Sequence, residues 1–350
     1  MRMTLMSVAL CVCFLDSAMA APNGPAPPAA IGAQAINDAQ WSGKAAQHVD
    51  GPMMVRLQVL LDRAHFSPGE IDGKRGENVD KAIMAYAASQ GLSSGLSEEL
   101  WQKLVEKFKD SVIVGYKISD ADLKGPFAEK IPEKMEDMKD LPALSYTSPK
   151  EKLAEQFHMS QELLVALNPD QKFDNPGATI MVVNVANADL PEKAARIEVD
   201  KSKQTLRVFG KSKALLAVYP VTAGSTDKPA PVGVLKVTST TKNPTYRYNP
   251  DFAFKGVKSR DAFTIKPGPN NPVGLAWIGL SKEGYGIHGT PEPSKVSKSD
   301  SHGCIRLTNW DALQLSSAVT KGVSVEFIGD ENERPTTQGH KQKSKRSKQS

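Results

Sequence analysis

Residues 286–313 read GIHGTPEPSKVSKSDSHGCIRLTNWDAL, and they carry the only cysteine of the chain beyond its first 20 residues. Side chains two positions apart point to the same face of an extended strand, so His302, Cys304 and Arg306 are predicted to share one face. The aliphatic residues that alternate with them are predicted to face the core. Cys304 is therefore expected to line a cleft.

The residues around Cys304 indicate thiol chemistry. A thiol becomes an effective nucleophile only when a nearby base or positive field favours its ionised form. His302, Arg306 and His288, which lies 16 positions before the cysteine, are the candidates that the sequence offers. Gly303 would let a substrate or another backbone segment come close. The segment therefore predicts a reactive cysteine.

A zinc site is the competing interpretation, with His288, His302 and Cys304 as ligands and water in the fourth position. The chain contains no HExxH and no CxxC pair. Ligands separated by a single residue are also an uncommon zinc arrangement. We therefore expect no metal and no cofactor.

The first 20 residues have the layout of a secretory signal peptide, with an early basic residue, an apolar run over residues 5–15 and small residues at 18–20. Cys11 and Cys13 lie inside it, so Cys304 is expected to be the only thiol of the mature protein. No later stretch approaches the roughly 18 apolar residues of a spanning helix. We expect an exported protein of the periplasm or cell wall, without an integral membrane span. In that oxidising setting an unpaired cysteine is reactive, inert or bridged to a second chain.

The positive charge is concentrated at the C-terminal end. The net charge is +5, and residues 331–350 account for +4 of it. Such a Lys-, Ser- and Gln-rich tail cannot bury a core and is expected to be disordered. Because the remainder is nearly neutral and the protein is expected to be exported, nucleic acid is not an expected partner.

Hydrophobic periodicity predicts an α+β, multidomain chain. Apolar stripes at 54–64, 79–87 and 100–108 predict three helices, the last capped by Ser97. Short β-branched runs between Gly, Pro and Asn turns predict a mainly β C-terminal domain with one helix at 309–319, for which Asn309 is the expected cap. The expected boundaries are 1–20 for the signal peptide, 21–45 for a linker, 46–110 for the helical domain, 111–143 for a connector, 144–187 for a small module, 194–329 for the β-rich domain and 330–350 for the basic tail.

Two N-terminal segments carry further patterns. Thr147-Ser148-Pro149 opens a two-helix stretch that ends in the apolar run 180–183, and this module resembles a degenerate LysM-type carbohydrate-binding module that lacks the usual Gly-Asp-Thr. A plain two-helix spacer is the alternative. The helical domain resembles the peptidoglycan-binding-like domain of many bacterial wall enzymes, although its residues could simply pack a core. The residues that carry this second resemblance are Leu57-Gln58, Phe66, Pro68-Gly69, Ile71-Asp72-Gly73, Gly76, Ala82-Ile83, Tyr86, Gly91-Leu92 and Trp101.

The segment His288-Gly289-Thr290, followed by SHGCIR at 301–306, resembles the catalytic signature of the L,D-transpeptidases. The resemblance covers nearly all of residues 194–329. Ser297 departs from it, because many members have glycine there. The resemblance implies that Cys304 is the nucleophile, that His288 is its base and that the carbonyl of Gly289 orients the imidazole. It further implies that Ser301 and His302 shape the site, that the amides of Gly303 and Cys304 bind an oxyanion, and that Arg306 binds a substrate carboxylate.

The implied activity is that of a cysteine acyltransferase of peptidoglycan biosynthesis. Its thiol would form a thioester with a tetrapeptide stem, release the terminal D-alanine and pass the acyl group to an amine. The expected partners are donor and acceptor stem peptides, or a lysine of an envelope protein. An L,D-carboxypeptidase that uses water as the acceptor is one alternative, and a non-enzymatic wall-binding protein is the other.

Overall fold

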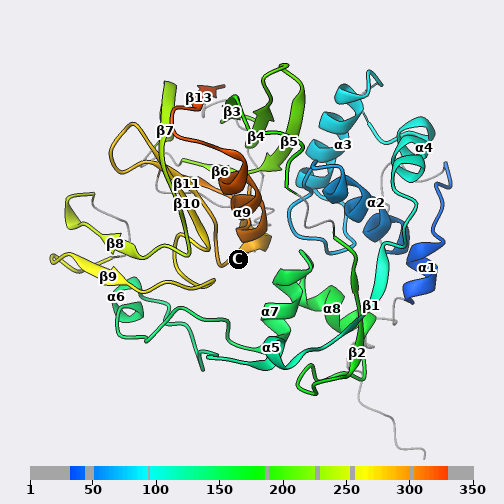
Figure 1. Ribbon diagram of the computed structural model, residues 1–350, viewed down its shortest axis with the longest axis horizontal. Coiled ribbons are helices and arrows are strands. Elements are labelled where there is room, and N and C mark those ends of the chain that lie inside the picture. The colour runs from blue at the N-terminus through cyan, green and yellow to red at the C-terminus, as the bar shows by residue number, and fades with distance from the viewer. Residues whose placement is uncertain are drawn as a thin grey trace, which may run out of the picture.

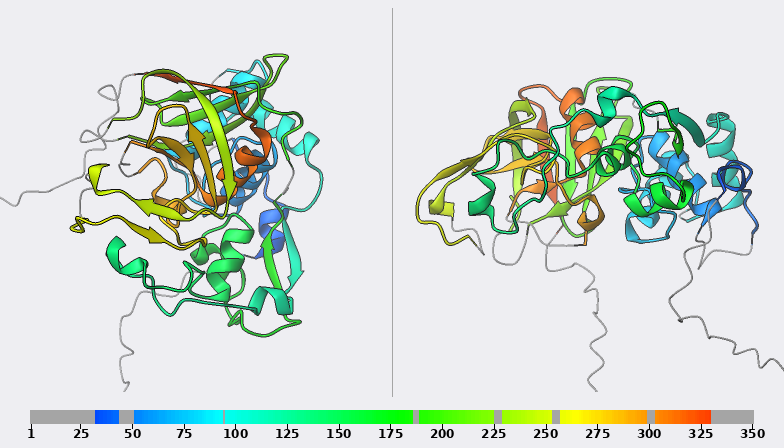
Figure 2. Two further views of the ribbon diagram at one scale, coloured as in Figure 1. Left: turned by 60° about the vertical axis from the view of Figure 1, so that its left-hand side comes forward. Right: turned by 90° about the horizontal axis from the view of Figure 1, so that it is seen from below.

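The computed structural model describes residues 32–43, 51–93, 95–185, 189–224, 229–252, 257–298 and 303–329. These residues form two hydrophobic cores, one in residues 36–183 together with Val218, and the other in residues 190–327. The two parts lie side by side, and α9 lies between the large sheet and α7 (Figure 1, Figure 2). The predicted signal peptide, about half of the predicted linker and the basic tail lie outside the described residues. The α+β class with a mainly β C-terminal domain is confirmed.

The first core is built on helices. The helices are α1 (Ala33–Asn37), α2 (Pro52–Arg63), α3 (Glu77–Ser89) and α4 (Glu98–Lys107). The three predicted stripes are buried, apart from Phe108, which is partly buried against the same core, because each amphipathic helix turns one face to it. The predicted cap of α4 is confirmed, because the hydroxyl of Ser97 accepts a hydrogen bond from the amide of Leu100 at 3.2 Å.

Residues 111–183 add a two-stranded sheet to this core. β1 (Ile113–Lys117) pairs antiparallel with β2 (Thr179–Val183), so the segment expected as a connector begins with a strand. Between them lie α5 (Asp120–Leu123), α6 (Met135–Met138), α7 (Pro149–Gln156) and α8 (Gln161–Leu167). The helical region and the 144–187 module therefore share one core.

The second core lies against a nine-stranded sheet of order β5-β4-β3-β13-β7-β10-β11-β12-β6. A separate hairpin, β8 (Tyr246–Tyr248) with β9 (Phe263–Ile265), and the helix α9 (Asn309–Ala318) complete this part, together with two short 3-10 turns, η1 (Pro250–Phe252) and η2 (Pro293–Lys295). The strands are β3 (Arg196–Asp200), β4 (Thr205–Phe209), β5 (Leu215–Pro220), β6 (Thr222–Ala223), β7 (Gly233–Lys242), β10 (Ala276–Leu280), β11 (Gly286–His288), β12 (Ile305–Arg306) and β13 (Ser324–Ile328).

The helical region covers the edge strand β5. The amide of Ser67 donates to the carbonyl of Val218, and the amide of Val218 donates to the carbonyl of His65, both at 2.9 Å. The hydroxyl of Ser67 also reaches the carboxyl of Asp311 on α9 at 2.9 Å. An exposed edge strand is prone to pair with other chains, and this docking removes that exposure.

The cap of α9 differs from the prediction. Thr308 is the N-cap, because its hydroxyl accepts from the amide of Asp311 at 3.2 Å. Asn309 is instead the first residue of the helix, and its side chain is used elsewhere. In the part of the chain that the structure describes, no helix is long and apolar enough to cross a membrane.

Candidate active site

Strand pairing brings the predicted nucleophile and base together. β11 and β12 are parallel neighbours, with Ile287 opposite Ile305 and His288 opposite Arg306. Cys304 directly precedes β12, so alternation along the strand places it on the same face as Arg306 and His288. Ile305 is fully buried, whereas Cys304 is half-buried, with its Sγ 3.7 Å from the carbonyl oxygen of Gly284. The thiol and the imidazole therefore come from adjacent strands and share a face.

The ring of His288 is held in one tautomer. Its Nδ1 lies 2.6 Å from the carbonyl oxygen of Gly289. A carbonyl can only accept a hydrogen bond, so Nδ1 must carry the proton and Nε2 is left as an acceptor. The indole of Trp277, which lies opposite His288 on the neighbouring strand β10, stacks on the imidazole with ring centroids 5.7 Å apart.

The same ring is electrically neutral at physiological pH. Burial and the neighbouring guanidinium of Arg306 lower the pKa of His288 to about 3, although the hydrogen bond to Gly289 acts in the opposite direction. Its unprotonated Nε2 can accept the thiol proton, and the thiolate formed beside it would raise the pKa of the ring and so favour the ion pair.

Arg306 places a positive charge beside the thiol. Burial lowers the pKa of Arg306, opposed by the charges of Glu292 and Cys304. Its Nε atom is buried without a hydrogen-bond partner among the described residues. A buried polar atom without a partner is uncommon, and an incoming anion would satisfy it.

Tyr246 was not identified from the sequence. It belongs to β8, and burial together with the charge of Cys304 raises its pKa. It therefore lies close enough to the thiol to sense its ionisation. Because it lies 58 residues before the cysteine, no local sequence pattern links the two residues.

Asn309 is a second residue that sequence reasoning placed in another role. Its Oδ1 accepts from the amide of Leu275 at 2.9 Å, and its Nδ2 donates to the carbonyl of Pro269 at 3.2 Å. A Cβ added to Gly289 would lie only 2.2 Å from this Oδ1, and one added to Gly274 only 2.0 Å. The carboxamide thus packs directly on the backbone whose carbonyl holds His288.

The departure at Ser297 has a structural explanation. Its φ is +65°, in the left-handed region that favours glycine. Its amide donates to the hydroxyl of Thr222 at 2.9 Å and its hydroxyl donates to the carbonyl of Val221 at 3.0 Å. These two bonds hold serine in a conformation that glycine adopts without strain.

The remaining predicted residues are only partly visible. Gly303 has φ +93°, in the region that favours glycine. Ser301 and His302 lie outside the described residues. The zinc interpretation needs His302 as a ligand, so the structure does not test it.

The comparisons place the part of the chain that carries the nine-stranded sheet and Cys304 in a family of catalytic domains. Residues 194–327 match the YkuD family, the L,D-transpeptidase catalytic domain. The chain is 30% identical over 178 residues to YkuD of Bacillus licheniformis, a protein assigned as an L,D-transpeptidase; the match covers 50% of this chain and 90% of that protein. It is 34% identical over 139 residues to YqjB of Bacillus subtilis, assigned likewise, covering 38% of this chain and 70% of the relative. The solved structure of L,D-transpeptidase 3 from Mycobacterium tuberculosis aligns with TM-score 0.32 and 18% identity, over 44% of this chain and 66% of the other.

The chain belongs to the L,D-transpeptidase family, a family of enzymes that act on peptidoglycan in the cell envelope. The predicted family is thus confirmed for the C-terminal domain. The family match begins at residue 194, so it leaves the N-terminal resemblances as predictions.

Proposed function

We propose that the protein is an exported L,D-transpeptidase that forms a thioester between Cys304 and a peptidoglycan tetrapeptide stem. The Sγ attacks the carbonyl of the third, diaminopimelate-type residue while Nε2 of His288 takes the thiol proton. The amides of Gly303 and Cys304 hold the negative oxygen of the tetrahedral intermediate, and one such donor is worth about 3 kcal/mol. The bond to the terminal D-alanine breaks, and its nitrogen leaves with the proton from His288.

Transfer completes the cycle. An amine of a second stem, or a lysine of an envelope protein, attacks the thioester carbonyl and gives up a proton, and the free thiol is restored. The observation that carries the proposal is the orientation of His288, whose Nδ1 is bound by the Gly289 carbonyl and whose strand β11 pairs with β12, the strand that follows Cys304. The buried Nε of Arg306 supports it, because a carboxylate of the stem would satisfy this donor. Ser301 and His302 are proposed to shape the same cleft.

The first experiment is intact-mass spectrometry of the full chain with a carbapenem, a β-lactam that acylates this family. We expect one adduct on the wild type and none on Cys304→Ala. Absence of the wild-type adduct, or an equal adduct on the variant, would refute the nucleophile. Replacement of His288 by Gln should slow alkylation of Cys304 near neutral pH, whereas chelators should change nothing.

Hydrolysis is the second candidate function, because water could resolve the same thioester in place of an amine. Analysis of products from purified muropeptides separates the two. Cross-linked dimers support transfer, and tripeptides alone support an L,D-carboxypeptidase.

For the N-terminal part we propose the boundaries given above, with a peptidoglycan-binding-like domain at 46–110 and a LysM-like module at 144–187. Co-sedimentation of the Cys304→Ala protein with insoluble peptidoglycan tests whether the chain grips the polymer independently of catalysis.

A further inference from the structure

The segment that leads into α7 is docked on the catalytic domain by backbone contacts. The amide of Leu144 donates to the carbonyl of Pro267, and the amide of Asn270 donates to the carbonyl of Leu144, both at 2.9 Å. The side chain of Asn270 also donates to Glu151 of α7 at 2.8 Å. A Cβ added to Gly268 would lie 2.1 Å from the carbonyl oxygen of Leu144, so the two segments are in direct contact. The segment before α7 and the start of that helix thus reach the loop at 266–275.

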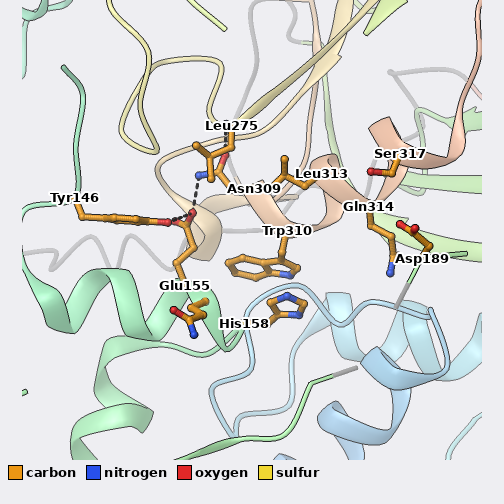
Figure 3. A pocket seen from close by; sticks show the side chains of 11 residues that line it. Tyr146, Glu155, His158, Asp189, Leu275, Asn309, Trp310, Leu313, Gln314 and Ser317 are labelled. Carbon is orange, nitrogen blue, oxygen red and sulfur yellow. Dashed lines mark hydrogen bonds between the residues drawn. The ribbon is translucent and has the colours of Figure 1, made fainter. Parts of the chain in front are cut away.

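Glu155, near the end of α7, extends this contact to α9. Its Oε1 accepts from Nδ2 of Asn309 at 2.9 Å and from the hydroxyl of Tyr146 at 3.1 Å, as Figure 3 shows. It lies in the wall of a cavity of about 290 Å³ between α7 and α9. Burial raises the pKa of Glu155 to about 7, opposed by these two hydrogen bonds. A partly buried carboxyl group with defined donors is a specific contact and not a solvated surface charge.

Asn309 passes this contact on to the catalytic backbone. Its amide nitrogen is held by Glu155 and Pro269, and this directs its oxygen towards the amide of Leu275. The same oxygen lies in the space that a side chain at Gly289 would fill. The carboxamide therefore packs against the backbone at Gly289, whose carbonyl orients His288.

We infer that Glu155 is a positioning residue for the reaction. Carried by α7, whose Leu153 and Ala154 belong to the first core, it fixes Asn309, and Asn309 fixes the Gly289 carbonyl that keeps Nε2 of His288 directed at the thiol. This inference rests on the proposed role of His288 as base. It makes the segment before residue 194 part of what the catalytic domain needs for full activity.

The test compares Glu155→Ala with Glu155→Gln in the full chain. Alanine removes the acceptor for Asn309, whereas glutamine keeps an oxygen of the same reach. Loss of this hydrogen bond lowers a rate about tenfold if the effect reaches the reacting atoms, because the donor left unsatisfied costs its desolvation free energy. We expect the alanine variant to acylate about tenfold more slowly with carbapenem at saturation, with the half-saturating concentration within twofold. The glutamine variant should stay within about threefold of the wild type.

Glu151→Ala is the matched control, because it removes a docking carboxylate of the same helix that bonds Asn270 and not Asn309. It should lower the thermal midpoint as Glu155→Ala does, yet acylate within threefold of the wild type. The inference is overturned if Glu155→Ala acylates at the wild-type rate, if glutamine fails to rescue, or if Glu151→Ala is equally slow.

A second readout separates this inference from the proposed function. In protein labelled with ¹⁵N-histidine, the nitrogen shifts of His288 report its tautomer without any substrate. We expect a single Nδ1–H tautomer in the wild type and in Glu155→Gln, and a mixture in Glu155→Ala. An unchanged spectrum in Glu155→Ala contradicts the positioning role, even for a protein that fails to react with carbapenem.

Discussion

Replacing Gly289 by alanine should disable the proposed base without touching either reacting side chain. The new Cβ would lie 2.2 Å from Oδ1 of Asn309 and 3.3 Å from its Cα. Ordinary contact of about 3.4 Å requires a shift of about 1 Å between the two segments. The present separation between Nδ1 of His288 and the Gly289 oxygen is 2.6 Å. A lengthening by about 1 Å would end this hydrogen bond. Misplacement of a catalytic group by that much costs about 10²-fold in rate.

The assay is the rate of carbapenem acylation, followed by intact mass, on protein whose folding is checked by its thermal midpoint. Gly76→Ala is the matched control, because no atom lies within 4 Å of its added Cβ and its φ of −155° suits alanine. Adding Asn309→Ala to Gly289→Ala removes the obstructing oxygen, so the double variant should be no slower than Asn309→Ala alone. A Gly289→Ala protein that is folded and acylates within threefold of the wild type would refute the reasoning.

Three further predictions follow from the charged groups. The imidazole of His288 should stay neutral from pH 8 to pH 5, and a titration near pH 6 in ¹⁵N spectra would contradict this. Because the same imidazole binds a proton below about pH 6.5 in the unfolded chain, it should make the free energy of unfolding fall as the pH drops from about 7 to about 3. Arg306→Met should raise the pH at which Cys304 is alkylated and weaken binding of a carboxylate-bearing stem about tenfold or more, measured by alkylation profiles and KM; an unchanged profile and KM would remove Arg306 from both roles. Burial and the nearby Asp62 raise the pKa of Asp311 to about 7, so the folded protein keeps a proton that the unfolded chain loses, and this group lowers stability as the pH rises from about 4 to 7. Asp311→Asn should therefore flatten the dependence of the thermal midpoint on pH in this range, and an unchanged dependence would contradict the prediction.

Local pattern was enough to predict the elements whose partners are close in the chain. The apolar stripes predicted α2, α3 and α4, and Ser97 was identified as a cap because a cap acts within one turn. The alternation around Cys304 predicted buried neighbours, and Ile305 and Leu307 are both fully buried. β1 was missed because Ile113 pairs with Val183, 70 residues away, and a strand of five residues with a glycine carries little signal of its own.

The sequence by itself determined which residues are available for thiol chemistry, because the spacing of His288 and Cys304 and the glycines between them follow directly from the order of residues. Only the tertiary structure decided the surroundings in which that chemistry operates. The neutral state of His288, the placement of Tyr246 and the contact from Glu155 through Asn309 to Gly289 all join residues far apart in the chain. Burial and charge depend on which groups are neighbours in space, and a linear pattern records neighbours only within a few positions.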